Sequence, residues 1–158
     1  RGWDSHATPL WSHARRHGLP LGLVMLDLDH FKHINDRYGH ETGDQVIREL
    51  GSALRTTLRR SDVAARMGGE EFALLLTYSD EAAARTLFAR LRLALEQLPI
   101  SGLEGPVRVS AGLALLAPGD HNLEALRARA DAALYLAKDQ GRDRLVLATT
   151  ASAPSSQA

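Results

Sequence analysis

The sequence predicts an α+β domain whose elements follow the order βαββαβ, with additional elements. Three observations predict it: a nearly unbroken apolar run suited to a buried strand, segments with apolar residues at helical spacing, and a diglycine turn between two short strand-like segments. This order describes a split βαβ unit, which is an antiparallel sheet with helices on one face. We therefore expect the other face of the sheet to stay open for a ligand or partner.

The apolar pattern locates the elements of the first half. Residues 11–18 are expected to end a basic, partly helical segment, which Gly18 and Pro20 stop. The apolar run 21–28 suits a central strand that is buried on both faces. Apolar residues then recur at three- and four-residue spacing over residues 46–58, which predicts an amphipathic helix.

A diglycine turn and two further helices organise the second half. The remaining predicted elements are strands at 63–67 and 72–77, a helix at 87–98, a strand at 107–113, a helix at 123–137 and a closing strand at 145–147. The turn Gly68-Gly69-Glu70-Glu71 joins the first two strands, because glycine permits positive φ. Gly112 inside a strand indicates a bulge or a close approach of backbone.

Composition restricts the class of protein. The 158 residues predict one domain over residues 1–148 and a frayed polar tail over 149–158. Nineteen basic residues balance nineteen acidic ones, which disfavours nucleic acid and membrane surfaces as partners. The chain has no cysteine, and no apolar run approaches the ~20 residues that span a bilayer. We expect a cytoplasmic domain, and the start without Met suggests a longer parent protein with an upstream sensory or regulatory domain.

Two acidic pairs are the first candidates for chemistry. Asp27 and Asp29 stand at the end of the apolar run, and only one of them is expected to face a given site. Asp29 could instead cap a helix, and Glu70-Glu71 could be no more than a polar hairpin tip. If the hairpin lies beside the first strand, Asp27 and Glu70 converge as hard oxygen ligands for Mg²⁺ or Mn²⁺, which bridges substrate phosphates.

Two further pairs have the chemistry to recognise a nucleotide. Asn35 and Asp44 lie nine residues apart across a turn, and an amide with a carboxylate can recognise guanine. Each could equally cap a helix. Lys138 and Arg142 flank the end of the last helix, with Gly141 as its left-handed cap. They could be partners of the helix dipole or clamps for phosphates.

Taken together, these motifs resemble the GGDEF family of diguanylate cyclases over about residues 20–147. The segments that carry the resemblance are Asp27-Leu28-Asp29-His30-Phe31-Lys32, Asn35-Asp36, Gly39-His40, Gly43-Asp44, Arg66-Met67-Gly68-Gly69-Glu70-Glu71-Phe72, Val109-Ser110-Ala111-Gly112 and the run from Ala130 to Arg142. The resemblance implies a palm-type fold similar to nucleotidyl cyclases. It also implies condensation of two GTP into cyclic di-GMP with release of pyrophosphate, across a homodimer that holds one GTP in each subunit.

The resemblance also implies roles for individual residues. Metal would be held by Asp27, the Leu28 carbonyl and Glu70, and Glu71 would activate the 3′-hydroxyl or support a second metal ion. Substrate would be bound by His30, Phe31, Lys32, Asn35, Asp44, Ile47, Gly69, Lys138 and Arg142. Arg59 and Asp62 match the family's RxxD inhibitory site, and Arg90 would add a contact, so inhibition by bound cyclic di-GMP is expected.

The sequence departs from the family in two places. The family's N-terminal motif, Asp-x-Leu-Thr-Gly-Leu-x-Asn-Arg-Arg, is absent before Trp11, which makes residues 1–19 atypical, and Asp143 replaces a usual Asn. The missing motif motivates an alternative, a catalytically inactive receptor for cyclic di-GMP or GTP. The intact Glu70-Glu71 pair favours the enzyme. A polymerase-like enzyme is disfavoured by the neutral net charge and the lack of a basic groove.

Overall fold

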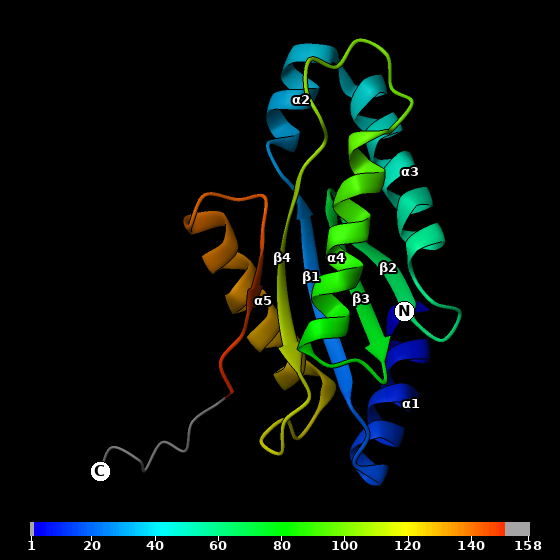
Figure 1. The fold of residues 1–158 in the computed structure, drawn as a ribbon, viewed down its shortest axis with the longest axis vertical. Coiled ribbons are helices and arrows are strands. Elements are labelled where there is room, and N and C mark those ends of the chain that lie inside the picture. Colours follow the sequence, from blue (N-terminus) through cyan, green and yellow to red (C-terminus); the bar gives the residue numbers. More distant parts are fainter. Residues whose placement is uncertain (1, 151–158) are drawn as a thin grey trace.

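The computed structural model describes residues 2–150, which fold into one mixed sheet covered by helices (Figure 1). The elements in chain order are α1 (Gly2–His17), β1 (Leu21–Leu28), α2 (Phe31–Tyr38), α3 (His40–Thr57), β2 (Val63–Gly68), β3 (Glu71–Thr77), α4 (Glu81–Glu96), β4 (Val109–Leu115), α5 (Leu123–Asp139) and β5 (Leu145–Leu147). The α+β class and the order of the predicted strands are confirmed.

The sheet has the strand order β2-β3-β1-β4-β5. The central strand β1 pairs antiparallel with both β3 and β4, and β2 pairs antiparallel with β3. The expectation of a wholly antiparallel sheet is wrong at one edge, where β5 pairs parallel with β4. This arises because α5 carries the chain back along the sheet between β4 and β5, as a crossover helix must in a parallel pair.

Helices cover both faces of the sheet, so the expected open face does not exist. One core packs β1 and β3 against α3 and α4, and its members include Leu26, Leu50 and Leu91. A second core packs the opposite face against α1 and α5, and its members include Met25 and Leu134. Strand β1 is therefore buried along its whole length, as its sequence, apolar except for Asp27, favours.

Three local features refine the predicted elements. Helix α2 occupies residues that the apolar period did not assign to an element, and α3 begins at His40, six residues before the predicted start. Gly112 marks a close approach rather than a bulge, because β4 pairs with β1 without a shift in register. A Cβ at Gly112 would stand 2.2 Å from the Ala130 carbonyl oxygen and from the Leu134 nitrogen, both in α5.

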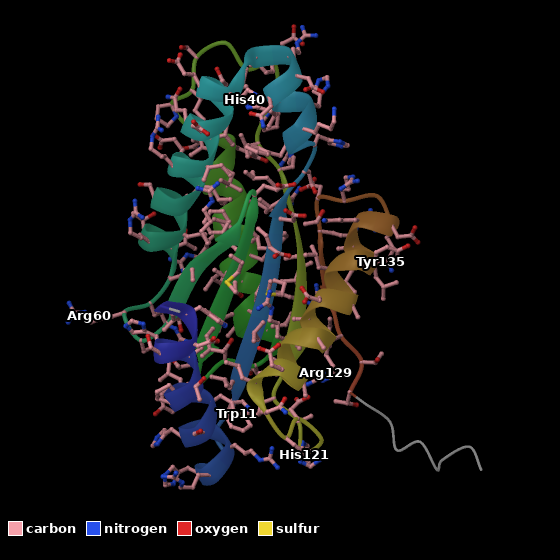
Figure 2. The ribbon with its side chains drawn as sticks, turned by 180° about the vertical axis from the view of Figure 1, so that it is seen from behind. Trp11, His40, Arg60, His121, Arg129 and Tyr135 are labelled. Carbon is pink, nitrogen blue, oxygen red and sulfur yellow. The ribbon has the colours of Figure 1, made fainter. Side chains whose placement is uncertain are left out.

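Helix α1 takes the place of the atypical N-terminal segment. It ends at His17, before Gly18 with a φ of 63°, as predicted, and its first turn lies beside Arg66 of β2. At its other end, Arg15 donates to the Asp120 carbonyl oxygen at 2.6 Å, and the buried Asp120 carboxylate accepts from Arg129 of α5. Figure 2 shows Arg129 and His121 at this end of the molecule, opposite His40. Helix α1 and helix α5 are thus tied together through Asp120.

Two further expectations concern the C-terminal tail and the absence of a membrane-spanning segment. Most of the tail predicted at 149–158 lies outside the described residues. Within residues 2–150, no helix combines the length and the apolar character that crossing a membrane needs.

Candidate active site

The acidic end of β1 and the diglycine hairpin meet at one edge of the sheet. Asp27 is directly opposite Glu71 in the β1–β3 pairing, and the Leu28 amide donates to the Glu70 carbonyl oxygen at 3.3 Å. The hairpin is tight because β2 ends at Gly68 and β3 starts at Glu71, which leaves Gly69, with a φ of 50°, and Glu70 as the turn. The convergence of Asp27 and Glu70 expected from the sequence is therefore present.

One pocket of about 460 Å³ collects most of the predicted site residues. Its lining residues are Asp27, Leu28, His30, Phe31, Lys32, His33, Asp36, Glu70, Lys138 and Arg142. His33 and Asp36 were not among the predicted site residues. Asp36 could have been found from its spacing of four residues from Lys32, which places both side chains on one face of a helix. His33 follows Lys32 directly in that helix, which begins after the acidic end of the strand.

Asp27 is the most constrained carboxylate of this pocket. Its side chain is buried, and one oxygen, Oδ2, accepts from the Lys138 ammonium of α5. Its other oxygen, Oδ1, is buried and has no hydrogen-bond partner among the described residues. A buried carboxylate oxygen without a donor is costly unless a cation or water satisfies it. With the Glu70 carboxylate on the same pocket, this donor set fits a hard divalent cation.

No group of three or more acidic or histidine side chains that could hold a metal occurs in the described part of the chain. The predicted ligand set is consistent with this finding, since it consists of two carboxylates and one backbone carbonyl. Substrate phosphates are the usual source of the remaining oxygen ligands of Mg²⁺.

Glu71 lies on the face of the sheet that α5 covers, and it does not line this pocket. Burial raises the pKa of its carboxyl, and the nearby carboxylates of Asp131 and Asp27 raise it further, while Arg127 and Lys138 oppose the shift. Burial also raises the pKa of Asp131 itself. Glu71 therefore holds its proton to a higher pH than an ordinary glutamate.

The raised pKa of Glu71 makes a prediction about stability. A carboxyl whose pKa is higher in the folded state favours folding while it is protonated, and this contribution is lost as the pH rises through the folded-state value. Glu71→Gln removes the ionised form, so we expect the temperature of thermal unfolding to rise at pH 8. The gain should vanish near pH 4, where wild-type Glu71 is protonated. An equal gain at both pH values would contradict the electrostatic cause.

The start of α2 presents backbone amides to the pocket. His30 precedes the helix with a φ of 57°, and no side chain caps the helix. The amide groups of the first turn therefore have no side-chain partner, and such groups bind anions. Lys32 is exposed beside them and pairs with Asp36 at 2.9 Å, a contact that raises the pKa of Lys32.

Asn35 lies in α2 and Asp44 in α3, on either side of the junction between the two helices. Asn35 Oδ1 is buried without a hydrogen-bond partner among the described residues, and it lies against Gly43, where an added Cβ would be only 1.8 Å away. Asp44 is exposed within α3. The capping alternative for Asp44 is wrong, because α3 begins at His40 and has Gly39 as its N-cap. Asp44 is thus accessible to a ligand, but neither Asn35 nor Asp44 lines the pocket described above.

Gly43 therefore offers a test of this pair. Gly43→Ala should displace the Asn35 side chain and weaken binding of GTP by about tenfold, since one well-placed hydrogen-bonding group contributes about 1.4 kcal/mol or more. The matched control is Gly51→Ala in the same helix, where the nearest atom is the flexible Arg55 Nη1 at 3.7 Å. We expect Gly51→Ala to bind GTP as wild type does and to stabilise the helix. Equal affinities of the two variants would exclude Asn35 from the base site.

Not every predicted site residue reaches the pocket. Ile47 is buried in the core beneath α3. The helix-capping alternative for Asp29 is wrong, because its carboxylate accepts instead from Ser110 and from the Asp143 amide. Gly141 has a φ of 121°, and the left-handed residues of this turn are Arg142 and Asp143.

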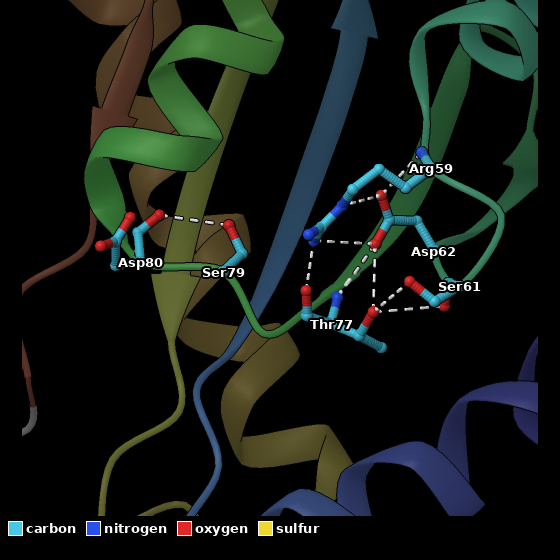
Figure 3. A network of polar contacts seen from close by, with 6 residues as sticks. All are labelled: Arg59, Ser61, Asp62, Thr77, Ser79 and Asp80. Carbon is cyan, nitrogen blue, oxygen red and sulfur yellow. Dashed lines mark hydrogen bonds and ion pairs between the residues drawn. The ribbon is translucent and has the colours of Figure 1, made fainter.

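The RxxD residues form a network of their own, away from the pocket (Figure 3). Asp62 Oδ2 accepts from the Arg59 amide, and its Oδ1 accepts from the Thr77 amide, both at 3.0 Å. Arg59 also donates to the Thr77 carbonyl oxygen. The Asp62 side chain is fully buried, so it organises the turn, whereas Arg59 and Arg90 line a shared surface pocket.

The fold and the site define a class of protein: an α+β domain in which an acidic strand end, an uncapped helix start and the cations Lys32, Lys138 and Arg142 surround one pocket. A family model described as diguanylate cyclase, GGDEF domain, matches residues 1–144. The chain therefore belongs to the GGDEF family of diguanylate cyclase domains. The match includes the segment in which the family's N-terminal motif was not recognised.

Curated relatives and solved structures agree with this assignment. The chain is 45% identical over 138 residues to diguanylate cyclase DgcP of Pseudomonas aeruginosa, covering 85% of this chain and 21% of that protein. It is 39% identical over 150 residues to the probable diguanylate cyclase DgcC of Escherichia coli, covering 94% of this chain and 40% of that protein. The chain thus spans well under half the length of these two relatives.

Two solved structures have the same fold. The active GGEEF domain of a diguanylate cyclase from Vibrio cholerae superposes with a TM-score of 0.86 at 30% identity, covering 94% of this chain and 95% of that one. The GGDEF domain of DgcB from Caulobacter crescentus in complex with c-di-GMP superposes with a TM-score of 0.84 at 35% identity, covering 92% and 87%. These likenesses confirm the predicted fold class.

Proposed function

We propose that this domain is an active diguanylate cyclase that converts two GTP into one cyclic di-GMP and two pyrophosphates. The observation that carries the proposal is the convergence of Asp27 and Glu70 on one pocket with Lys138 and Arg142. Acidic groups alone would repel a triphosphate, and cations alone would bind many anions. Their combination suits a triphosphate bound together with a divalent cation.

Most of these residues would bind the metal or the substrate, and one would take part in the reaction. Asp27, the Leu28 carbonyl and Glu70 would hold Mg²⁺ or Mn²⁺, which supplies neutralisation of the phosphate charge when bound. Lys138, Arg142 and the first amides of α2 bind the phosphates. Asn35 and Asp44 select guanine. Glu71, which lies directly opposite Asp27 in the sheet, is the candidate to accept the proton of the attacking 3′-hydroxyl or to support a second metal ion.

One GTP per domain cannot form both phosphodiester bonds within a single site. We therefore propose that two copies of the chain face each other during catalysis, with one GTP in each. The direct test incubates the domain with GTP and Mg²⁺ or Mn²⁺ and separates the products by chromatography. Cyclic di-GMP formed by wild type and not by Glu70→Ala supports the proposal.

The second candidate is a receptor that binds cyclic di-GMP or GTP without turnover. The shared pocket of Arg59 and Arg90 favours a binding function, whereas the Asp27–Glu70 pair has no use in a pure receptor. Wild type that binds cyclic di-GMP but forms none, at concentrations that allow dimers, would replace the enzyme with the receptor.

Product inhibition through the RxxD surface gives a separate prediction. Arg59→Ala should leave the initial rate unchanged and relieve inhibition by cyclic di-GMP, because the guanidinium suits guanine edges and phosphates. Arg59 also contacts Thr77, so Arg90→Ala, which spares that contact, is the companion variant. Progress curves with added product measure the effect, and unchanged inhibition in both variants would reject the assignment.

A further inference from the structure

A buried carboxylate outside the predicted site residues joins β1 to the turn that follows α5. Asp29 is 5% exposed, and both of its carboxylate oxygens are satisfied within the protein. Oδ1 accepts from the Ser110 hydroxyl of β4 at 2.5 Å, and Oδ2 accepts from the Asp143 amide at 2.9 Å. Ser110 is itself fully buried, so its bond to Asp29 is shielded from solvent on that side. The Asp29 carboxylate, directly after β1, thereby links Ser110 of β4 to the backbone of the turn that follows α5.

That turn has an unusual backbone. Gly141, Arg142 and Asp143 have φ values of 121°, 67° and 50° in succession. Left-handed conformations are unfavourable for residues with a Cβ and persist only where surrounding contacts hold them. The Arg142 amide donates to the Ala137 carbonyl oxygen at 2.9 Å, and the next amide donates to Asp29. The Asp29 carboxylate is therefore one of the contacts that hold the turn.

The turn decides where one phosphate-binding cation stands. Arg142 lines the pocket with Asp27 and Glu70, and its Nη1 lies 3.9 Å from Asp29 Oδ1. On the far side of the turn, the Asp143 side chain pairs with Arg92 of α4 at 2.8 Å. The Asp29 carboxylate thus contacts the turn twice, at the Asp143 amide and at the Arg142 guanidinium.

We propose that Asp29, oriented by Ser110, is a positioning residue that holds the 141–143 turn so that Arg142 faces the triphosphate of the substrate. The inference rests on the proposed function, because it assigns the phosphate clamp of that same pocket. Asp29 contacts no reacting atom in this scheme and acts through Arg142. An asparagine cannot replace it, because an amide presents one acceptor where the carboxylate presents two.

The test compares Asp29→Asn with Arg142→Ala and with the double variant. Asp29→Asn should raise the KM for GTP by about tenfold or more and change kcat less. Loss of a residue that orients a metal ligand costs about 10- to 100-fold in other proteins, and we expect a similar factor here. The double variant should have the KM of Arg142→Ala alone, because both changes remove the same clamp. Asp139→Asn, which removes an exposed carboxylate at the end of α5, should keep the wild-type KM.

Binding measurements separate this inference from the proposed function. Wild type that fails to bind GTP with Mg²⁺ or Mn²⁺ would defeat the proposed function itself. If wild type binds GTP and Asp29→Asn binds it equally well, or if the two losses add in the double variant, the positioning role is rejected. Should Asp29→Asn fail to fold, Ser110→Ala, which removes the donor to Oδ1, must show a smaller rise in KM in the same direction. An unchanged KM in folded Ser110→Ala would then overturn the inference.

Discussion

Asp27→Asn is expected to lower the rate of cyclic di-GMP formation about 1,000-fold. The change removes the negative charge from the most buried carboxylate of the pocket, and charge stabilisation in such a site is worth that order of rate. It also leaves the Lys138 ammonium without its anionic partner. The rate is measured from product formation at saturating GTP and metal.

A metal-binding measurement tells this effect from misfolding. Wild type with GTP should unfold at a higher temperature when Mn²⁺ is added, because a ligand that binds the folded state stabilises it. The Asp27→Asn variant should lose this response to metal. Glu81→Gln, which breaks only an exposed pair with Arg85, is the control and should keep wild-type activity and response. Activity of Asp27→Asn within tenfold of wild type would remove Asp27 from the metal site.

Gly112→Ala is expected to destabilise the domain by about 3 kcal/mol, which is the upper part of the usual range for overpacking. The new Cβ would stand 2.2 Å from two backbone atoms of α5, and backbone in a helix cannot rotate away as a side chain can. For a chain of this size, the loss corresponds to a fall in unfolding temperature of roughly 6 to 12 °C. Chemical denaturation followed by circular dichroism measures the change in the free energy of unfolding.

The consequence for function follows from the position of the contact. Helix α5 carries Lys138 close to its end, so a helix pushed away from β4 also displaces the phosphate-binding pocket. Gly119→Ala is the control, because nothing lies within 4 Å of a Cβ there and its φ is not positive. An equal and small effect of the two substitutions would show that β4 and α5 pack less tightly than the structure indicates.

The parts of the fold that could be predicted are those set by the local pattern of apolar residues. The buried strand at 21–28 was predicted to the residue, because an eight-residue run that is apolar except for Asp27, bounded by Pro20 and Asp29, is typical of a buried strand. The closing strand at 145–147 was also found, but its parallel pairing was not, since pairing direction depends on the path of α5. Helix α2 was missed because it has only eight residues, and its apolar residues Phe31 and Ile34 are only partly buried against the core.

The candidate site divides in the same way. Asp27, Glu70, Lys138 and Arg142 were predicted from motif and chemistry, and one pocket contains all four. Asp29 was treated as the weaker partner of Asp27 or as a helix cap. Its actual contacts, with Ser110 and with the Asp143 amide, join residues separated by 81 and 114 positions in the chain. No spacing rule reaches across such separations.

By itself, the sequence determined the α+β class, the order of the strands, the family and the residues with the right chemistry for a metal-bound triphosphate. These properties follow from local periodicity and from side-chain type, which are independent of how the chain closes. Packing decided the rest: helices on both faces, the pairing of Asp27 with Lys138, the burial that raises the pKa of Glu71, and the support of Arg142 by Asp29. Each of these features depends on contacts between segments that are far apart in the sequence, and such contacts form only when the two cores pack.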